Sequence, residues 1–135
     1  MAVTSKLQYL GTLRIEAEHL KSGKTFITDA PTDNQGKGEA FSPTDILATS
    51  LGACIITVMG IRAVEEGLDL ENCQATVQKV MEVNPRRVAE VHVEVSLKAN
   101  CSSKMQKIIE GIGRNCPVAK SLHPDLKQVV TIKWL

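Results

Sequence analysis

The sequence predicts an α+β fold in which antiparallel strand hairpins pack against long helices. Three observations lead to this class. Residues 7–19 alternate between apolar and polar, as a half-buried strand does. Residues 72–81 and 88–99 form two such strands with only a short turn between them, which indicates a hairpin. Residues 42–66 are rich in apolar side chains and carry helix-start and helix-end signals. Strands that follow one another in hairpins favour α+β over α/β.

Length and charge narrow the class of protein further. The chain has 135 residues, which fits one domain over 1–135, and a formal net charge of +1. Basic and acidic residues are interspersed and aromatic residues make up 3%, so neither a phosphate-binding surface nor a base-stacking surface is expected. The first residues lack the pattern of a secretory signal, and the uncharged run Ile46–Ile61 is shorter than the roughly 20 residues of a membrane span. We therefore expect a cytoplasmic protein that binds neither nucleic acid nor membrane.

The N-terminal part is expected to contain two strands. Residues 7–19 are interpreted as one half-buried strand, because apolar and charged side chains alternate from Leu13 to Glu18. Ser22 and Gly23 indicate a turn, and residues 24–28 a returning strand. The polar, glycine-containing segment 30–41 follows, and a loop of this length in a compact domain is often a lid or a binding loop.

A long helix is expected next, with clear signals at both ends. Ser42 suits the N-cap, Pro43 the first helical position, and Asp45 can complete a capping box. The helix is expected to run to about Glu66 and to end at Gly67. Its apolar residues fall on every side when they are placed on a helix, so it must be enclosed all round. One small sheet covers only one side, which favours a partner subunit over a second layer within the chain.

The remaining elements complete the order β-β-α-β-β-α-α-β. The hairpin of residues 72–81 and 88–99 turns at Asn84-Pro85. A second helix is expected from Ser102 or Ser103 to about Gly113, a short helix over 117–122, and a last strand over 126–134. Alternation predicts that one row of the second hairpin strand faces the core: Val91, Val93, Val95 and Leu97.

Two of the four cysteines suggest redox chemistry at sulfur. Cys54 lies in the middle of the uncharged helix, and Cys116 directly precedes Pro117 at the start of the short helix. Burial disfavours a thiolate, so a reactive Cys54 needs a cation from elsewhere, whereas unpaired amides at a helix start favour a Cys116 thiolate. Composition and spacing alone favour a simpler interpretation, in which both are small packing residues.

The surroundings of Cys54 on the helix predict an apolar pocket. Leu47, Leu51 and Val58 share its helical face and would form an apolar wall. Such a pocket suits an apolar peroxide better than a charged substrate. Cys73 and Cys101 are expected to be bystanders, and because the cysteines contain no C-x-x-C pair, a zinc site is not expected.

Two motifs resemble the OsmC/Ohr family, in particular its OsmC-like branch. They are SPTDILATSLGAC (residues 42–54) and CPVAKSL (residues 116–122), and the order of strands and helices between them fits as well. The resemblance implies an intertwined homodimer in which sheets from both chains wrap two central helices. It also implies a stress-response enzyme that reduces organic hydroperoxides with thiols and needs no metal or organic cofactor.

The resemblance also implies roles for the two cysteines. Cys54 would be the peroxidatic nucleophile that is oxidised to a sulfenic acid. Cys116 would condense with it to a disulfide, which a dithiol reductant, lipoyl-like in related proteins, would reduce by exchange.

A charged clamp is the other implied part of the site. The family holds the thiolate with an arginine from the N-terminal strands, and Arg14 is the best match. The family holds that arginine with a glutamate near the start of the central helix, and this chain has Thr44 there. Asp45 points about 100° away around the helix, and Glu39 in the preceding loop could substitute. The pair Arg86 and Arg87 remains an alternative source of the cation.

Three functions stay open on these grounds. The first is a two-cysteine organic hydroperoxide reductase. The second is a dimer that has weak or lost peroxidase activity and binds an apolar small molecule in the Cys54 pocket, of which Thr44 and Glu39 are also expected to be part. The third is a structural protein with inert cysteines. Rapid oxidation of Cys54 by a peroxide separates the first from the other two.

Overall fold

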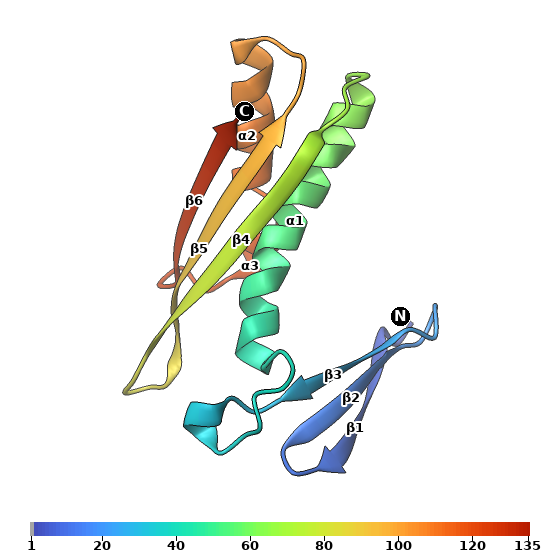
Figure 1. Cartoon of the computed structure of the whole chain (residues 1–135), viewed down its shortest axis with the longest axis vertical. Coiled ribbons are helices and arrows are strands. Elements are labelled where there is room, and N and C mark those ends of the chain that lie inside the picture. The colour runs from blue at the N-terminus through green and yellow to red at the C-terminus, as the bar shows by residue number, and fades with distance from the viewer. Residues whose placement is uncertain (1) are drawn as a thin grey trace. The chain divides into compact units, whose positions relative to one another are not determined.

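The computed structural model describes residues 2–135, which form two compact units. The first unit ends at Leu47 and the second runs from Ala48 to Leu135. Figure 1 labels the elements along the chain. In the first unit these are β1 (Ser5–Gly11), β2 (Arg14–His19), β3 (Thr25–Asp29), the 3-10 turn η1 (Thr32–Asn34) and the start of α1 (Pro43–Glu65). In the second they are β4 (Glu71–Glu82), β5 (Arg87–Lys98), α2 (Ser103–Arg114), α3 (Pro117–Ser121) and β6 (Lys127–Trp134).

The first unit contains a three-stranded antiparallel sheet in the order β1-β2-β3. The prediction of a single strand over 7–19 is wrong, because the chain reverses between β1 and β2. Gly11, Thr12 and Leu13 all have positive φ (87°, 53° and 63°), and Leu13 N–H donates to the Tyr9 hydroxyl at 3.3 Å. Apolar and polar residues alternate with the same phase before and after this tight turn. The two-residue pattern of the sequence therefore gives no sign that the chain reverses here.

The turn at Ser22-Gly23 is confirmed, and the loop that follows β3 folds back on itself. Gly36 N–H donates to the Pro31 carbonyl at 2.9 Å, and Gly38 N–H donates to the Ala30 carbonyl at 3.2 Å. A Cβ at Gly36 would lie 1.7 Å from the Ala30 carbonyl oxygen, so only glycine fits this approach. The loop is therefore built around its glycines and brings Glu39 back toward the end of β3.

Helix α1 begins and ends as its sequence predicts. Asp45 N–H donates to Ser42 Oγ at 3.0 Å, and Ser42 N–H donates to Asp45 Oδ2 at 3.0 Å, which is a reciprocal capping box. The helix ends at Glu65, and Gly67 follows in the left-handed region (φ 68°).

The second unit holds a mixed sheet in the order β4-β5-β6. The hairpin of β4 and β5 is antiparallel, and its turn at Asn84-Pro85 contains a cis peptide bond. Strand β6 pairs with β5 in parallel, because α2 and α3 carry the chain back before β6 begins. The α+β class is confirmed, but the prediction that strands occur only in hairpins is wrong for β6.

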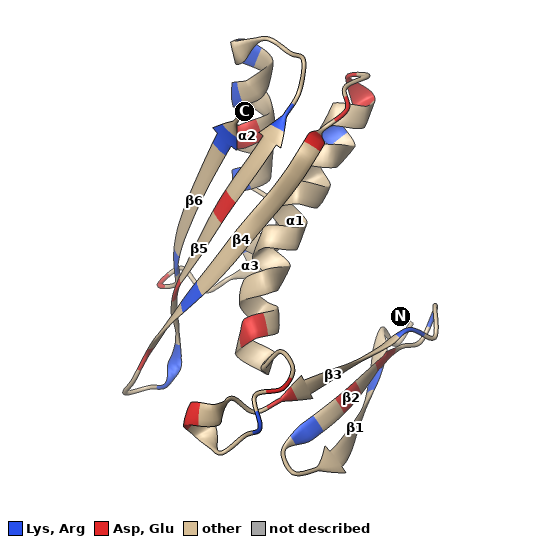
Figure 2. Cartoon of the chain, in the orientation of Figure 1, with Lys and Arg blue, Asp and Glu red and all other residues tan. Residues whose placement is uncertain are grey.

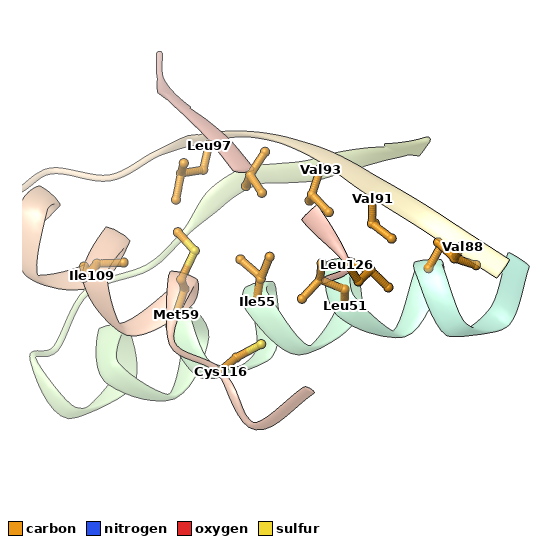
Figure 3. Packing of buried hydrophobic residues seen from close by; sticks show 12 residues of the cluster. Leu51, Ile55, Met59, Val88, Val91, Val93, Leu97, Ile109, Cys116 and Leu126 are labelled. Carbon is orange, nitrogen blue, oxygen red and sulfur yellow. The ribbon is translucent and has the colours of Figure 1, made fainter. Parts of the chain in front are cut away.

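The core of the second unit lies between β5 and the helices. Leu51, Ile55 and Met59 of α1 are fully buried beside Ile109 of α2, and Figure 3 shows the α1 side chains pointing toward β5. Each fully buried side chain of this size contributes about 1.5–3 kcal/mol. The predicted inward row of β5 is confirmed, with exposures of 0 or 1%: Val91, Val93, Val95 and Leu97.

The glycine at the end of α2 allows the helices to approach closely. A Cβ at Gly113 would lie 2.9 Å from both Cγ and Sδ of Met59, and 3.2 Å from Ile55 Cγ2. This close fit holds the segment that leads into α3 against α1.

One side of α1 stays uncovered within the chain. Ile61 is 55% exposed and Val64 is 78% exposed. By length and composition alone the helix is long and apolar enough to cross a membrane, a test that the core helix of a soluble protein also passes. Figure 2 shows that the middle of α1 carries no charged residue and that basic and acidic residues are spread over the other elements. A single sheet thus covers only part of this helix, and the expected partner subunit stays a prediction.

Candidate functional site

The structure brings the two predicted redox cysteines together. Cys54 is half-buried on α1, and Cys116 is 1% exposed at the N-cap of α3. The Cys54 thiol lies near enough to the Cys116 thiol to add to the rise in its pKa that burial causes, and neither cysteine is in a disulfide. Figure 3 shows Cys116 beside α1, away from the α1 side chains that point to β5. Two neighbouring thiols of this kind are a candidate pair for a disulfide.

Backbone contacts on both sides of Cys116 fix its position. Its Sγ accepts the Ala119 N–H at 3.4 Å, so the sulfur itself caps α3, and Pro117 occupies the first turn. Its own N–H donates to the Gly113 carbonyl at 3.3 Å. Gln128 Nε2 of β6 donates to the Ala119 carbonyl at 2.9 Å. The second thiol is therefore held by α2, α3 and β6 together.

The electrostatics of Cys116 differ from the sequence-based expectation. Burial raises the pKa of the Cys116 thiol, the amides of Ala119 and Val118 partly oppose this rise, and the Cys54 thiol adds to it. The expected thiolate at the helix start is therefore wrong for the reduced protein, because desolvation outweighs two amide dipoles. A thiol that stays protonated is a poor first nucleophile but can still attack an adjacent electrophilic sulfur.

Arg14 in the first unit contacts two carboxylates, those of Asp29 and Glu39. Its Nε donates to Asp29 Oδ1 at 2.7 Å and its Nη2 donates to Asp29 Oδ2 at 2.9 Å, which is a bidentate pair. Nη2 also donates to Glu39 Oε1 at 3.2 Å. The Asp29 side chain is 1% exposed, Arg14 is 27% exposed and Glu39 is 65% exposed. Glu39 therefore contacts Arg14, as the sequence analysis considered.

Asp29 is the residue that the sequence reasoning missed. The hydrogen bonds from Arg14 lower the pKa of Asp29 and raise the pKa of Arg14, so both groups are charged. The missing signal was strand register: Arg14 and Asp29 are directly paired across β2 and β3, whereas the sequence-based strand ended at residue 28. A cross-strand pair of opposite charges stabilises such a position.

The two residues at the start of α1 take part in its cap. Thr44 Oγ1 lies 3.2 Å from Ser42 Oγ, and the Asp45 carboxylate accepts the Ser42 N–H. Among the arginines of the β4–β5 turn, Arg87 pairs with Glu82 at 3.0 Å. These contacts stabilise the start of α1 and the turn between β4 and β5.

The residues of the predicted apolar pocket have different surroundings. Leu51 is fully buried in the core, Val58 is half-buried against it, and Leu47 is 38% exposed. An open apolar depression of about 300 Å³, which sequence reasoning did not predict, lies in the first unit and contains none of the predicted pocket residues. It is lined by Tyr9, Leu13, Ile15, Thr28, Ala30, Pro31, Asn34 and Pro43.

The other two cysteines, Cys73 and Cys101, are not part of a candidate metal site within residues 2–135. Cys73 and Cys101 are half-buried, and burial raises the pKa of Cys73. Within residues 2–135, no three His, Cys, Asp or Glu side chains are grouped so that they could hold a metal ion.

Comparison with known proteins gives one family. The family model described as OsmC-like protein matches residues 36–130. A crystal structure from Psychrobacter arcticus 273-4, of a candidate osmotic stress induced and detoxification response protein, is 52% identical with a TM-score of 0.93. The match covers 98% of this chain and 96% of that one. No curated protein matches the chain.

More distant structures share the fold. An OsmC-like protein from Mycoplasma pneumoniae is 15% identical with a TM-score of 0.78, and the match covers 100% of this chain and 98% of that one. An organic hydroperoxide resistance protein OsmC from Legionella pneumophila is 14% identical with a TM-score of 0.70, and the match covers 98% of each chain.

Proposed function

Because this chain belongs to the OsmC-like family, we propose that it is a cysteine-based peroxidase that reduces organic hydroperoxides. The observation that carries the proposal is the proximity of the Cys54 and Cys116 thiols. The stress and detoxification role suggested for the Psychrobacter relative supports this proposed function. The name of the Legionella protein, an organic hydroperoxide resistance protein, agrees with it. We place the enzyme in the cytoplasm, where thiols are kept reduced.

The first step is nucleophilic attack by Cys54. Its thiolate attacks the terminal oxygen of the hydroperoxide, so an S–O bond forms as the O–O bond breaks. The leaving alkoxide takes a proton and departs as the alcohol. Sulfur is oxidised by two electrons to a sulfenic acid and the peroxide is reduced by two.

The second step is resolution by Cys116. Its sulfur attacks the sulfenic sulfur, an S–S bond forms, and the hydroxyl group leaves as water after taking the Cys116 proton. A dithiol, which we expect to be lipoyl-like, then reduces the disulfide through a mixed disulfide and is itself oxidised to its cyclic disulfide. The sum is one hydroperoxide and one dithiol converted to one alcohol, one water and one disulfide. No metal or organic cofactor takes part.

Arg14 is proposed as the cation that holds the Cys54 thiolate. The family resemblance assigns this role, and within the first unit the Arg14 guanidinium is held by its contacts to Asp29 and Glu39. We further propose a homodimer, because an apolar side of α1 that includes Ile61 and Val64 stays exposed within one chain. Leu47 and Val58, with Thr44 and Glu39, remain the proposed surroundings of the apolar substrate.

The test is a reaction with one equivalent of cumene hydroperoxide followed by mass spectrometry. The wild type is expected to form a Cys54–Cys116 disulfide that dihydrolipoamide reduces, and Cys54→Ser is expected to consume no peroxide. Cys101→Ser serves as the matched control and should behave as wild type. Peroxide consumption by Cys54→Ser at the wild-type rate would end the proposal.

A second candidate function is binding of an apolar small molecule by a dimer with little peroxidase activity. Thr44 favours it, because it brings no negative charge to the position where the family carries a glutamate. Saturable binding of an apolar probe combined with slow oxidation of Cys54 would support this function over the first.

A further inference from the structure

We propose that the dithiol reductant attacks the oxidised site at the Cys54 sulfur, so that the mixed disulfide forms on Cys54 and Cys116 is the leaving group. This inference rests on the proposed peroxidase function, which supplies the Cys54–Cys116 disulfide, and it assigns each sulfur a role in reduction. Exchange at either sulfur gives the same final products, so the difference in access to the two sulfurs decides between them.

Cys116 is enclosed by its own chain. The residue is 1% exposed and belongs to the buried core of the second unit. Its N–H donates to the Gly113 carbonyl at 3.3 Å, and its Sγ accepts the Ala119 N–H at 3.4 Å. An incoming thiolate must touch the sulfur that it attacks. Attack at Cys116 therefore requires α3 to leave its place first.

Cys54 lies on the side of α1 that its own chain leaves uncovered. The residue is half-buried, and two of its helix neighbours, Ala53 and Thr57, are exposed. Ile61 is 55% exposed and lies on nearly the same side of the helix, since positions seven apart differ by only about 20° around it. A small thiol can therefore reach the Cys54 sulfur without any unfolding of the chain.

The proposed homodimer does not change this difference. A second subunit that covers the Ile61 side of α1 must leave a path to Cys54, because the hydroperoxide has to reach that sulfur in the first step. Cys116 is already buried within one chain, and association can only bury it further. The peroxide and the dithiol therefore use the same path, one after the other.

The exchange at Cys54 balances as follows. One thiolate of the dithiol attacks Cys54 Sγ, a new S–S bond forms, and the bond to Cys116 Sγ breaks. The electron pair stays on Cys116 Sγ, which takes up a proton. The second thiol of the reductant then attacks its own sulfur in the mixed disulfide, closes the cyclic disulfide and releases Cys54 as a thiolate. The protein gains two electrons and the dithiol loses two.

The pKa of Cys116 slows this route but also favours its completion. Burial raises the pKa of the Cys116 thiol, and a thiolate of higher pKa is a poorer leaving group. Once released, however, Cys116 is held as the protonated thiol, which is a poor nucleophile for return attack on the mixed disulfide. The second thiol of the reductant then meets little competition from Cys116.

The competing explanation is attack at Cys116 after α3 opens locally. This helix has five residues, and Gln128 Nε2 of β6 donates to the Ala119 carbonyl at 2.9 Å. Gln128→Ala removes this bond and should loosen α3, which faster alkylation of Cys116 in the reduced protein would report. Thr131→Ala is the matched control, because Thr131 is exposed on the same strand and its removal leaves the bond to Ala119 in place.

The experiment identifies the sulfur that carries the first mixed disulfide. Wild type is oxidised with one equivalent of cumene hydroperoxide and then mixed at pH 7 with N-acetylcysteine, a monothiol that cannot complete the reduction by ring closure. Samples are quenched at successive times with N-ethylmaleimide in urea, digested and analysed by mass spectrometry. Extrapolation to zero time removes later transfer between the two sulfurs. The adduct is expected on Cys54 in roughly 10-fold or greater excess, with maleimide on Cys116.

The variants test whether enclosure by α3 causes this preference. Gln128→Ala should carry a larger share of the adduct on Cys116 than wild type, and Thr131→Ala should match wild type. If Gln128→Ala does not speed alkylation of Cys116, wild type in urea below its unfolding transition takes its place.

Two results would overturn the inference. The first is an adduct that is equal on both sulfurs, or larger on Cys116, at the earliest times in wild type. The second is an unchanged share of adduct when Cys116 has become more accessible. Failure of the peroxidase proposal looks different: cumene hydroperoxide would form no Cys54–Cys116 disulfide. Diamide would then be used to form the disulfide for the same experiment, and absence of the disulfide with diamide as well would refute both proposals.

Discussion

Besides burial, the neighbouring Cys54 thiol of α1 raises the pKa of the Cys116 thiol at the start of α3. The first residue lies in the long helix and the second in the five-residue helix that precedes β6. Two thiols that lie near one another on separate helices are a candidate pair for a disulfide.

Replacement of Cys116 should separate the two steps of the proposed reaction. Cys116→Ser is expected to consume about one equivalent of cumene hydroperoxide and then stop, because the sulfenic acid on Cys54 lacks the adjacent sulfur that resolves it. Dimedone labelling followed by mass spectrometry should find the adduct on Cys54. Cys73→Ser, the matched control, should turn over as wild type does. Sustained turnover of Cys116→Ser with dihydrolipoamide would show that the second thiol is dispensable.

The pKa of Cys116 should be visible in its labelling by iodoacetamide. Burial raises this pKa above the ordinary thiol value of 9.0, so in Cys54→Ser the folded protein should label slowly at pH 8. The rate should rise only as pH passes above about 9, since the thiolate is the nucleophile. The same protein unfolded in urea should label faster at pH 8. Equal rates in the folded and unfolded protein at pH 8 would contradict the burial of this thiol.

Asp29 should contribute stability that depends on pH. Its pKa is lowered in the folded state by the hydrogen bonds from Arg14, so it holds its proton less tightly than in the unfolded chain. The contribution is therefore present above the unfolded value of about 3.9 and is lost as pH falls through the lower folded value. Urea unfolding should show that Asp29→Asn is less stable than wild type at pH 7, and that the difference shrinks toward pH 3. A difference that stays constant over this range would mean that the charge of Asp29 does not matter.

The loop 30–41 should depend on Gly36. Gly36→Ala would place a Cβ 1.7 Å from the Ala30 carbonyl oxygen, so the loop must rearrange and displace Glu39. We expect a loss of roughly 1–3 kcal/mol in the free energy of unfolding. Gly111→Ala in α2 is the matched control, because nothing lies within 4 Å of its Cβ, and it should be neutral or gain about 0.5–1 kcal/mol. Urea denaturation measures both, and equal stability of the two variants would show that the loop tolerates a side chain.

The sequence predicted the parts of the fold whose signals are local. The capping box of Ser42 and Asp45, the end of α1 near Gly67 and the hairpin turn at Asn84-Pro85 each follow from a few adjacent residues. The inward row of β5 follows from alternation, because burial of one face imposes a period of two on a strand.

The parts that were missed depend on how distant segments pair. The parallel pairing of β6 with β5 is set by the path of α2 and α3, which no residue of 127–134 encodes alone. The reversal at Gly11–Leu13 leaves the apolar pattern in phase. The ion pair of Asp29 with Arg14 follows from the register of β2 and β3, which no local motif encodes.

The fit of Gly113 against Met59 bears on the reactivity of sulfur as well as on stability. Cys116 N–H is bonded to the Gly113 carbonyl, so the spacing between the two thiols depends on how closely α2 docks onto α1. A bulkier residue at this one position would push the helices apart and lengthen the gap that a disulfide must close, while both cysteines stayed chemically intact. Packing density in an apolar interior thus becomes a determinant of how readily this protein is oxidised.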